Sequence, residues 1–213
     1  MKLDLATLPL PAIVETPARH RRRHRVGGLD LDNGALRRFQ RIAGSLDPES
    51  PPPGADALAS AARSLIHQFA GTRRAPCIRL RLRCLRALRM MSGEPDWGLD
   101  ADKQQRIALI AGYAANHGRL VPESVPVIGG LDEAVLVELA WPSLRFELGD
   151  YLDFRRLRTE EAALQGRRPH AIAYSREQWL QSQYAELAWR AHTRRCGRES
   201  YLGPPAPPLF RVH

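Results

Sequence analysis

The chain has 213 residues, 44% of them hydrophobic, which suits a globular protein with one core. Its longest uncharged run, residues 107–118, is far shorter than the roughly 20 apolar residues of a membrane-spanning helix, so we expect no transmembrane segment. The formal net charge is +9, but residues 57–93 carry eight arginines and no acid, while residues 94–166 carry thirteen acids and seven bases. These two blocks can neutralise each other, so the net charge alone does not predict a nucleic-acid-binding protein.

The first 28 residues have the composition of a disordered tail. They are rich in proline, and they contain the basic run HRRRHR at residues 20–25 before two glycines. An early acid, Asp4, and prolines within the apolar part argue against a signal peptide. The three cysteines have no C-x-x-C spacing, which suits reduced thiols. We therefore expect a cytoplasmic protein, with peripheral attachment to a membrane as an alternative.

From residue 29 onward, apolar residues recur at helical spacing. Residues 29–34 are typical of a turn that opens a helix ending near residue 44, and the pattern predicts a second helix over residues 55–70. Residues 76–91 are ambiguous, because apolar residues and arginines also alternate there as they would in a half-buried strand. We favour a helix, since Pro76 suits the first helical position and the sequence offers no second strand for pairing.

The next predicted helix can be capped by Asp100 or Asp102, and it ends near residue 116. Three more helices are predicted after it. Residues 131–140 are almost wholly apolar, and Pro142 can begin a separate amphipathic helix. A capping-box pattern at residues 175–178 begins the last helix.

The predicted fold class is therefore all-α, a single helical domain of about six to seven helices with disordered ends. The helical domain is expected at residues 29–197. A disordered tail rich in proline and arginine is expected at residues 1–28, and a proline-rich tail at residues 198–213.

Motifs of known catalytic and metal sites are missing from the sequence. It contains no H-E-x-x-H, no G-x-S-x-G and no glycine-rich phosphate loop. His20 and His24 lie among arginines, whose charge opposes metal binding, and Cys77 and Cys84 suit buried apolar positions. We therefore predict no catalytic residue, no metal ligand and no cofactor.

The acidic side chains of the second half form one constellation. Glu138 lies on the apolar stripe of its predicted helix, so we expect it to be buried with Arg145 as its partner. A structural ion-pair network is the preferred interpretation, while a ligand or metal site and general acid–base catalysis remain as alternatives. The predicted network comprises Glu123, Asp132, Glu133, Glu138, Arg145, Glu147 and Asp153.

The arginines offer a second constellation, which could contact phosphate, anionic lipid or an acidic protein surface. Its candidate residues are Arg21, Arg22, Arg23, Arg25, Arg79, Arg81 and Arg83. Those of residues 79–86 do not share one helical face, and no aromatic residues accompany them as a stacking platform. A solvated or internally paired face is therefore the preferred interpretation.

One further pattern in residues 113–158 comprises Tyr113, Val121-Pro122-Glu123, Val125-Pro126, Gly129 and Leu131-Asp132-Glu133-Ala134. This pattern resembles the YkvA-like domain of bacterial proteins, and the similarity extends more weakly over residues 29–195. The resemblance implies a small helical protein from a family of unknown function, with no general catalytic activity assigned. Members are usually acidic ahead of the first proline, whereas this chain has Asn116, His117, Gly118 and Arg119, which weakens a cation site.

Together these features predict a non-catalytic scaffold or adaptor that binds a protein partner, and we expect that partner to be acidic. The alternative is binding of nucleic acid or an anionic membrane surface through the arginine-rich segments. A weaker alternative is an enzyme or cation-binding protein that uses the loop carboxylates.

Overall fold

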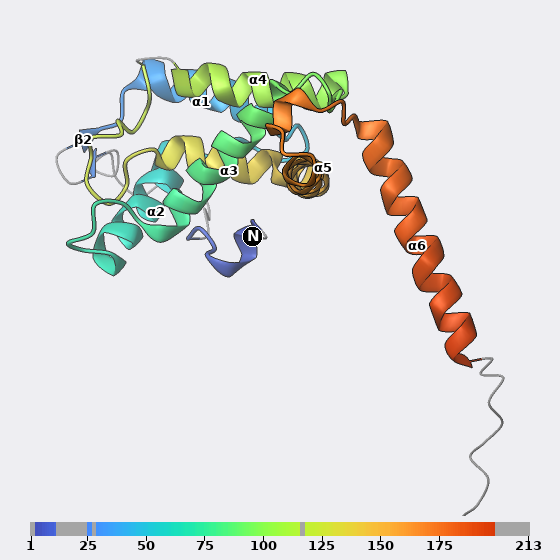
Figure 1. Ribbon diagram of the computed structural model, residues 1–213. Coiled ribbons are helices and arrows are strands. Elements are labelled where there is room, and N and C mark those ends of the chain that lie inside the picture. Colours follow the sequence, from blue (N-terminus) through green and yellow to red (C-terminus); the bar gives the residue numbers. More distant parts are fainter. Residues whose placement is uncertain (1–2, 12–24, 27–28, 116–117, 199–213) are drawn as a thin grey trace, which may run out of the picture. The chain divides into compact units, whose positions relative to one another are not determined.

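A computed structural model describes residues 3–11, 25–26, 29–115 and 118–198, with the side chains of residues 25–26, 29–30 and 197–198 left out (Figure 1). Most of the expected disordered ends, residues 1–2, 12–24, 27–28 and 199–213, lies outside the described part. The described residues form six α-helices, and the predicted all-α class is confirmed.

The described helices are, in chain order, α1 (Asn33–Leu46), α2 (Ala55–Gln68), α3 (Pro76–Ser92), α4 (Ala101–Ala115), α5 (Leu131–Leu164) and α6 (Arg176–Arg198). Two 3-10 turns, η1 (Leu5–Thr7) and η2 (Pro169–Ala171), and one short antiparallel pair, β1 (Arg25–Val26) with β2 (Leu29–Asp30), complete the described elements. The chain divides into two compact units, Met1–Asp153 and Phe154–His213, which we describe separately.

Several helix starts occur where the sequence predicts them. The carboxylate of Asp32 accepts a hydrogen bond from the amide of Ala35 at 2.7 Å and so caps α1. Pro76 occupies the first turn of α3, which confirms the helix over the alternative strand. At α6, Gln178 and Ser175 exchange side-chain to backbone hydrogen bonds, as a capping box requires.

The core of the first unit forms where α4 packs against both α1 and α3 (Figure 1). Phe39 of α1 is fully buried, and its ring meets the edge of Tyr113 of α4 with centroids 6.3 Å apart. Ile78 of α3 and Ile110 of α4 are likewise fully buried. Each such side chain contributes about 1.5–3 kcal/mol by leaving water, so this contact holds the unit together.

Residues 3–11, which the sequence places in the disordered tail, are part of the first unit. Leu5 is buried, and η1 packs against α3. The carbonyl of Leu8 accepts a hydrogen bond from Nη1 of Arg81 at 2.7 Å. A buried cation on α3 therefore holds this N-terminal segment in place.

The second unit combines the end of α5 with η2 and α6. The rings of Phe154 and Tyr174 stack with centroids 5.5 Å apart. Arg158 lies over the same Phe154 ring, and its Nε donates to the carbonyl of Pro169 at 2.8 Å. These contacts fold the η2 segment back onto the last turns of α5.

The two helices expected around Pro142 are one helix, because α5 continues through this residue. Proline removes a backbone donor from a helix, which is the reason for expecting a break there. Ala140 and Leu144, on either side of Pro142, are both fully buried in the first unit. Burial of the apolar residues on both sides outweighs the missing hydrogen bond.

Replacing Pro142 with Ala should raise the free energy of unfolding by about 1–3 kcal/mol. Pro142 is exposed, so little buried area is lost, and alanine restores an amide donor to the carbonyl of Glu138. Urea unfolding followed by circular dichroism measures the change. Pro51→Ala, in the exposed loop before α2, is the control and should lower stability slightly. A loss of stability in Pro142→Ala would contradict a continuous α5.

Candidate functional site

The loop of residues 118–130 is fastened to the segment that precedes α3. The amide of Val127 donates to the carbonyl of Arg73 at 3.1 Å, and the amide of Ala75 donates to the carbonyl of Val127 at 2.8 Å. The loop also approaches itself closely at Gly129, where a Cβ atom would lie 2.5 Å from the carbonyl oxygen of Glu123. Only glycine fits this approach, so the loop has one defined course.

Asp132, at the start of α5, closes the other side of the loop. One of its oxygens accepts hydrogen bonds from the hydroxyl of Tyr113 at 2.5 Å and from the amides of Leu120 and Val121 at 2.9 and 3.2 Å. The residue is fully buried, and this burial raises the pKa of its carboxyl, although the three donors oppose the change. Burial and the neighbouring Asp132 also raise the pKa of Tyr113. Asp132 of α5 therefore connects the loop and Tyr113 of α4 through hydrogen bonds.

Glu133 is the next residue, and it is buried without a complete set of partners. Its Oε1 lies 3.0 Å from Nε of Arg119, but without the geometry of a hydrogen bond. Burial raises the pKa of this carboxyl to about 7, with Arg119 opposing the shift. Arg119 also donates from Nη1 to Glu123 at 2.5 Å, so one guanidinium serves two carboxylates.

The prediction that Glu138 pairs with Arg145 is wrong. Glu138 bonds to Nε of Arg81 at 2.6 Å, whereas Arg145 is exposed and lies over the ring of Phe146. The side chain of Glu138 is 44% exposed and that of Arg81 is fully buried, so the buried charge is the cation. Glu138 lies at the margin of the apolar stripe of its helix. Helical spacing alone places a residue on such a stripe but does not tell whether it lies at the centre or at the margin.

The remaining predicted acids lie apart from this loop. Glu147 is buried, and it accepts hydrogen bonds from Nε1 of Trp97 and from Nζ of Lys103, both at 2.9 Å. Asp153 is half-buried, two turns further along α5. The predicted single network is therefore several separate clusters. Among the described residues, no group of three or more His, Cys, Asp or Glu side chains could hold a metal ion.

The predicted anion-binding arginines have different positions. Arg79 and Arg83 are exposed on α3, but Arg81 is fully buried on the opposite face, so it is unavailable to an external anion. The remaining predicted residues were Arg21, Arg22 and Arg23, which lie outside the described residues, and Arg25, whose backbone is in β1 and whose side chain is not described.

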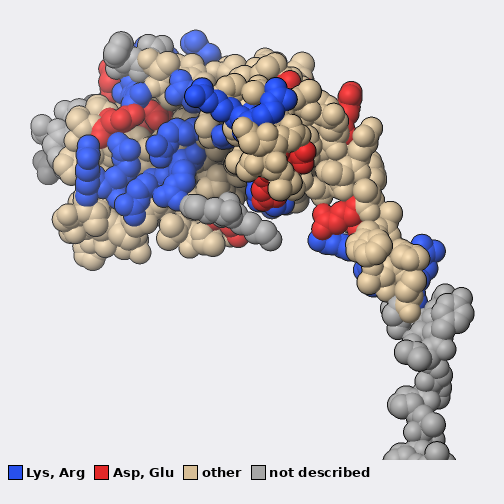
Figure 2. Space-filling model, in the orientation of Figure 1, with Lys and Arg blue, Asp and Glu red and all other residues tan. Residues whose placement is uncertain are grey.

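The structure instead gathers five arginines around one cavity of about 320 Å³. This arginine pocket is lined by Arg74, Arg79, Arg86, Arg89 and Arg119, together with Glu123, Glu133, Leu82, Leu85 and Ala114. Figure 2 shows a dense group of basic side chains on this side of the first unit, over the region of α3. The pocket is built from α3, the segment before it, the end of α4, the loop before α5 and the first turn of α5.

Four arginines of this pocket are absent from the sequence-based set. Arg86 and Arg89 follow Arg79 by seven and ten residues, a spacing that places all three on one face of a helix. The shared face is therefore visible in the sequence once the helix is followed as far as Arg89. Arg74 and Arg119 lie on separate segments, and only the fold brings them together.

The charges of the arginine pocket are only partly balanced. Arg119 contacts Glu133 and Glu123, and Nη2 of Arg74 lies 3.8 Å from Oε2 of Glu123. Arg79, Arg86 and Arg89 form no ion pair with any described carboxylate, and they are exposed. The pocket therefore has a positive face on α3 and a smaller acidic part at the loop.

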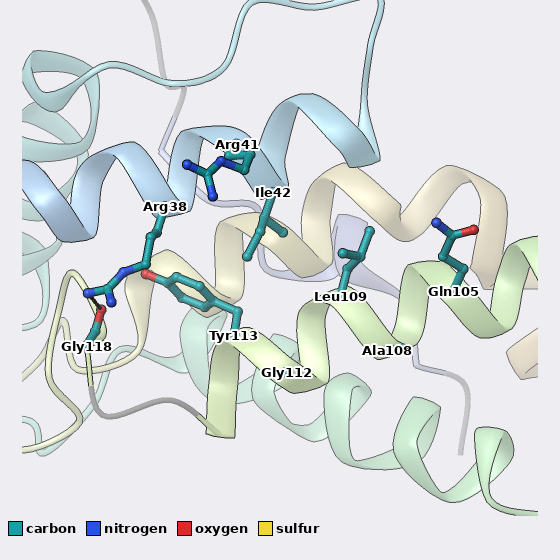
Figure 3. Close-up of a pocket in the computed structure, with 9 residues that line it drawn as sticks. All are labelled: Arg38, Arg41, Ile42, Gln105, Ala108, Leu109, Gly112, Tyr113 and Gly118. Carbon is teal, nitrogen blue, oxygen red and sulfur yellow. Dashed lines mark hydrogen bonds between the residues drawn. The ribbon is translucent and has the colours of Figure 1, made fainter.

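A second groove, of about 420 Å³, lies between α1 and α4 (Figure 3). Arg38 at its edge already donates to the carbonyl of Gly118 at 3.0 Å. Its wall on α4 includes the small residues Ala108 and Gly112, and the hydroxyl of Tyr113 donates to Asp132. This groove has fewer charges and no buried carboxyl, so the arginine pocket is the stronger candidate site.

No protein-family model, curated protein or solved structure matches the chain. The YkvA-like resemblance of residues 113–158 therefore stays a prediction. In the described part of the chain, no helix combines the length and apolar character needed to cross a membrane.

The raised pKa of Glu133 predicts a stability difference that depends on pH. Because the folded state holds this proton up to about pH 7 and the unfolded state releases it near pH 4.5, stability falls as the pH rises between these values. Glu133→Gln removes this effect. The variant should gain about 1–3 kcal/mol relative to the wild type on going from about pH 5 to about pH 8. Urea unfolding at both pH values tests this, and a constant difference would contradict it.

Glu138→Gln should lower the free energy of unfolding by about 1–2 kcal/mol, because the buried guanidinium of Arg81 then lacks a negative partner. The matched control is Glu160→Gln, which breaks an exposed pair with Arg156 and should change stability by about 0.5 kcal/mol or less. Equal effects of the two variants would show that the Arg81 contact has no special structural role.

Proposed function

We propose that this protein is a non-catalytic adaptor that binds an acidic protein segment through the arginine pocket. One observation carries the proposal: Arg79, Arg86 and Arg89 face the same cavity, and none is paired with a described carboxylate. Exposed guanidinium groups that share one concave surface can each form charge-assisted hydrogen bonds with a carboxylate of a partner.

The distribution of acids within the first unit supports this role. The acids of residues 94–166 do not neutralise these arginines of α3. Asp132, Glu133 and Glu147 are buried, and each contacts a donor that is not on α3. Among the arginines of α3, Arg81 is the one that forms an ion pair with a described carboxylate, that of Glu138. The outer face of α3 therefore keeps its positive charge for an external partner.

The composition of the pocket favours a protein partner over single-stranded nucleic acid. No aromatic side chain lines it, and proteins that bind single strands stack bases on aromatic rings. Binding is also favoured over catalysis, because the carboxylates of Asp132 and Glu147 already accept hydrogen bonds from structural donors. The YkvA-like resemblance, which assigns no general activity, agrees with an adaptor.

The cysteines support a reducing compartment, and we place the protein in the cytoplasm. Cys77 and Cys84 have free thiols buried in the first unit, and burial raises the pKa of both, that of Cys84 to about 11. Cys196 of α6 is also free, and it is exposed. A thiol exposed in this way persists where the environment keeps it reduced.

Neutralising part of the pocket should weaken binding of an acidic peptide. For Arg86→Gln/Arg89→Gln we expect the affinity for a fluorescent peptide of alternating Glu and Ala to fall about tenfold, since two charge-assisted contacts are lost. Fluorescence anisotropy measures the affinity, and added salt should weaken the wild-type complex.

The matched control is Arg37→Gln/Arg41→Gln, which removes the same charge from exposed positions of α1 outside the arginine pocket. Its affinity should change by about twofold or less, because distant charges are screened. Equal losses in both double variants would mean that only net charge matters, and the assigned site would then be wrong. Absence of binding by the wild type would reject the proposal as a whole.

A further inference from the structure

The arginine pocket has the size and chemistry of a site for one small anionic group. Its volume of about 320 Å³ is near the lower end of ligand pockets, which begin at roughly 300 Å³. Five guanidinium groups and two carboxyl groups line it, so the empty pocket has a net positive charge that a bound dianion would reduce. Such enrichment in arginine over lysine is typical of sites that read planar or tetrahedral oxyanions by paired N–H donors.

We propose that the arginine pocket binds a phosphate monoester, seated against Arg79, Arg86 and Arg89 on α3, with Arg119 and Glu133 at the loop side. The inference rests on the proposed adaptor function and gives its acidic partner a defined chemical group. A phosphate monoester offers three terminal oxygens and about two negative charges at neutral pH. It can therefore engage more guanidinium groups at once than a single carboxylate, which has two oxygens and one negative charge.

The buried, incompletely bonded carboxyl of Glu133 is the second observation that points to a ligand. Its Oε1 is buried and makes no hydrogen bond in the described structure, although it lies 3.0 Å from Nε of Arg119 and Glu133 lines the pocket. A protonated carboxyl can donate to a phosphate oxygen, whereas an ionised one repels it. The charged groups that act on Glu133 are Arg119 and Glu123 of the loop, Arg74 before α3 and Asp132 beside it on α5.

Arginine-to-lysine substitution separates a phosphate site from a merely basic surface. Arg86→Lys/Arg89→Lys keeps both charges but removes the forked pair of donors. We expect the affinity for an acidic phosphoserine peptide to fall about tenfold, while the affinity for the same peptide without phosphate changes by about twofold or less. Arg37→Lys/Arg41→Lys, on exposed positions of α1, is the control and should leave both affinities unchanged.

A second variant tests the position of the phosphate beside Glu133. At about pH 8, Glu133→Gln should bind the phosphoserine peptide about five- to tenfold more tightly than the wild type, because a negative charge is removed from the pocket. At about pH 6 the wild-type carboxyl is mostly protonated, so the two affinities should converge. The ratio of affinities cancels the titration of the phosphate itself. A ratio that does not change with pH would overturn the proposed position.

Free O-phosphoserine and inorganic phosphate distinguish the possible sources of the group. Much tighter binding of the peptide assigns the site to a phosphorylated protein, and equal binding of free O-phosphoserine assigns it to a small phosphate ester. If the unphosphorylated peptide binds as tightly and Arg86→Gln/Arg89→Gln still weakens it, the phosphate inference fails while the adaptor function stands. Tighter binding of a DNA oligonucleotide or of phosphatidylserine vesicles would also overturn the inference.

Discussion

One buried carboxylate, that of Asp132, holds the loop before α5 against the end of α4. Its Oδ2 accepts three donors, two of them loop amides, so a movement of the loop would remove hydrogen bonds from this buried oxygen. The position of Glu133 follows directly, because it is the next residue of the same helix. Arg119 then lies between Glu133 and Glu123, and the acidic part of the arginine pocket is complete.

Helical periodicity divides the arginines of α3 between the core and the surface. Arg81 faces inward, where Glu138 and the carbonyls of Leu8 and Cys77 compensate part of its desolvation. Arg79, Arg86 and Arg89 face outward together. A sequence without any acid between residues 57 and 93 thus produces one structural cation and one basic surface, and the two roles depend only on position along the helix.

Local signals in the sequence predict most of the fold. The turn that opens α1, the capping box at Ser175 and the first-turn Pro76 are local, so the sequence identifies them. The continuity of α5 through Pro142 depends on burial on both sides, which local rules do not report. The partner of Glu138 and the arginine pocket depend on contacts between segments that are distant in sequence. Helical periodicity predicts which face of a helix is buried, but it does not predict which residues of other segments that face contacts.

The unequal exposure of the three thiols has a practical consequence. Cys77 and Cys84 are buried and resist deprotonation, so alkylating reagents should leave them intact in the folded protein. Cys196 is exposed on α6 and should take up a maleimide dye selectively. The wild-type chain therefore carries its own attachment point for a fluorophore, distant in sequence from every arginine of the pocket, and no engineered cysteine is needed.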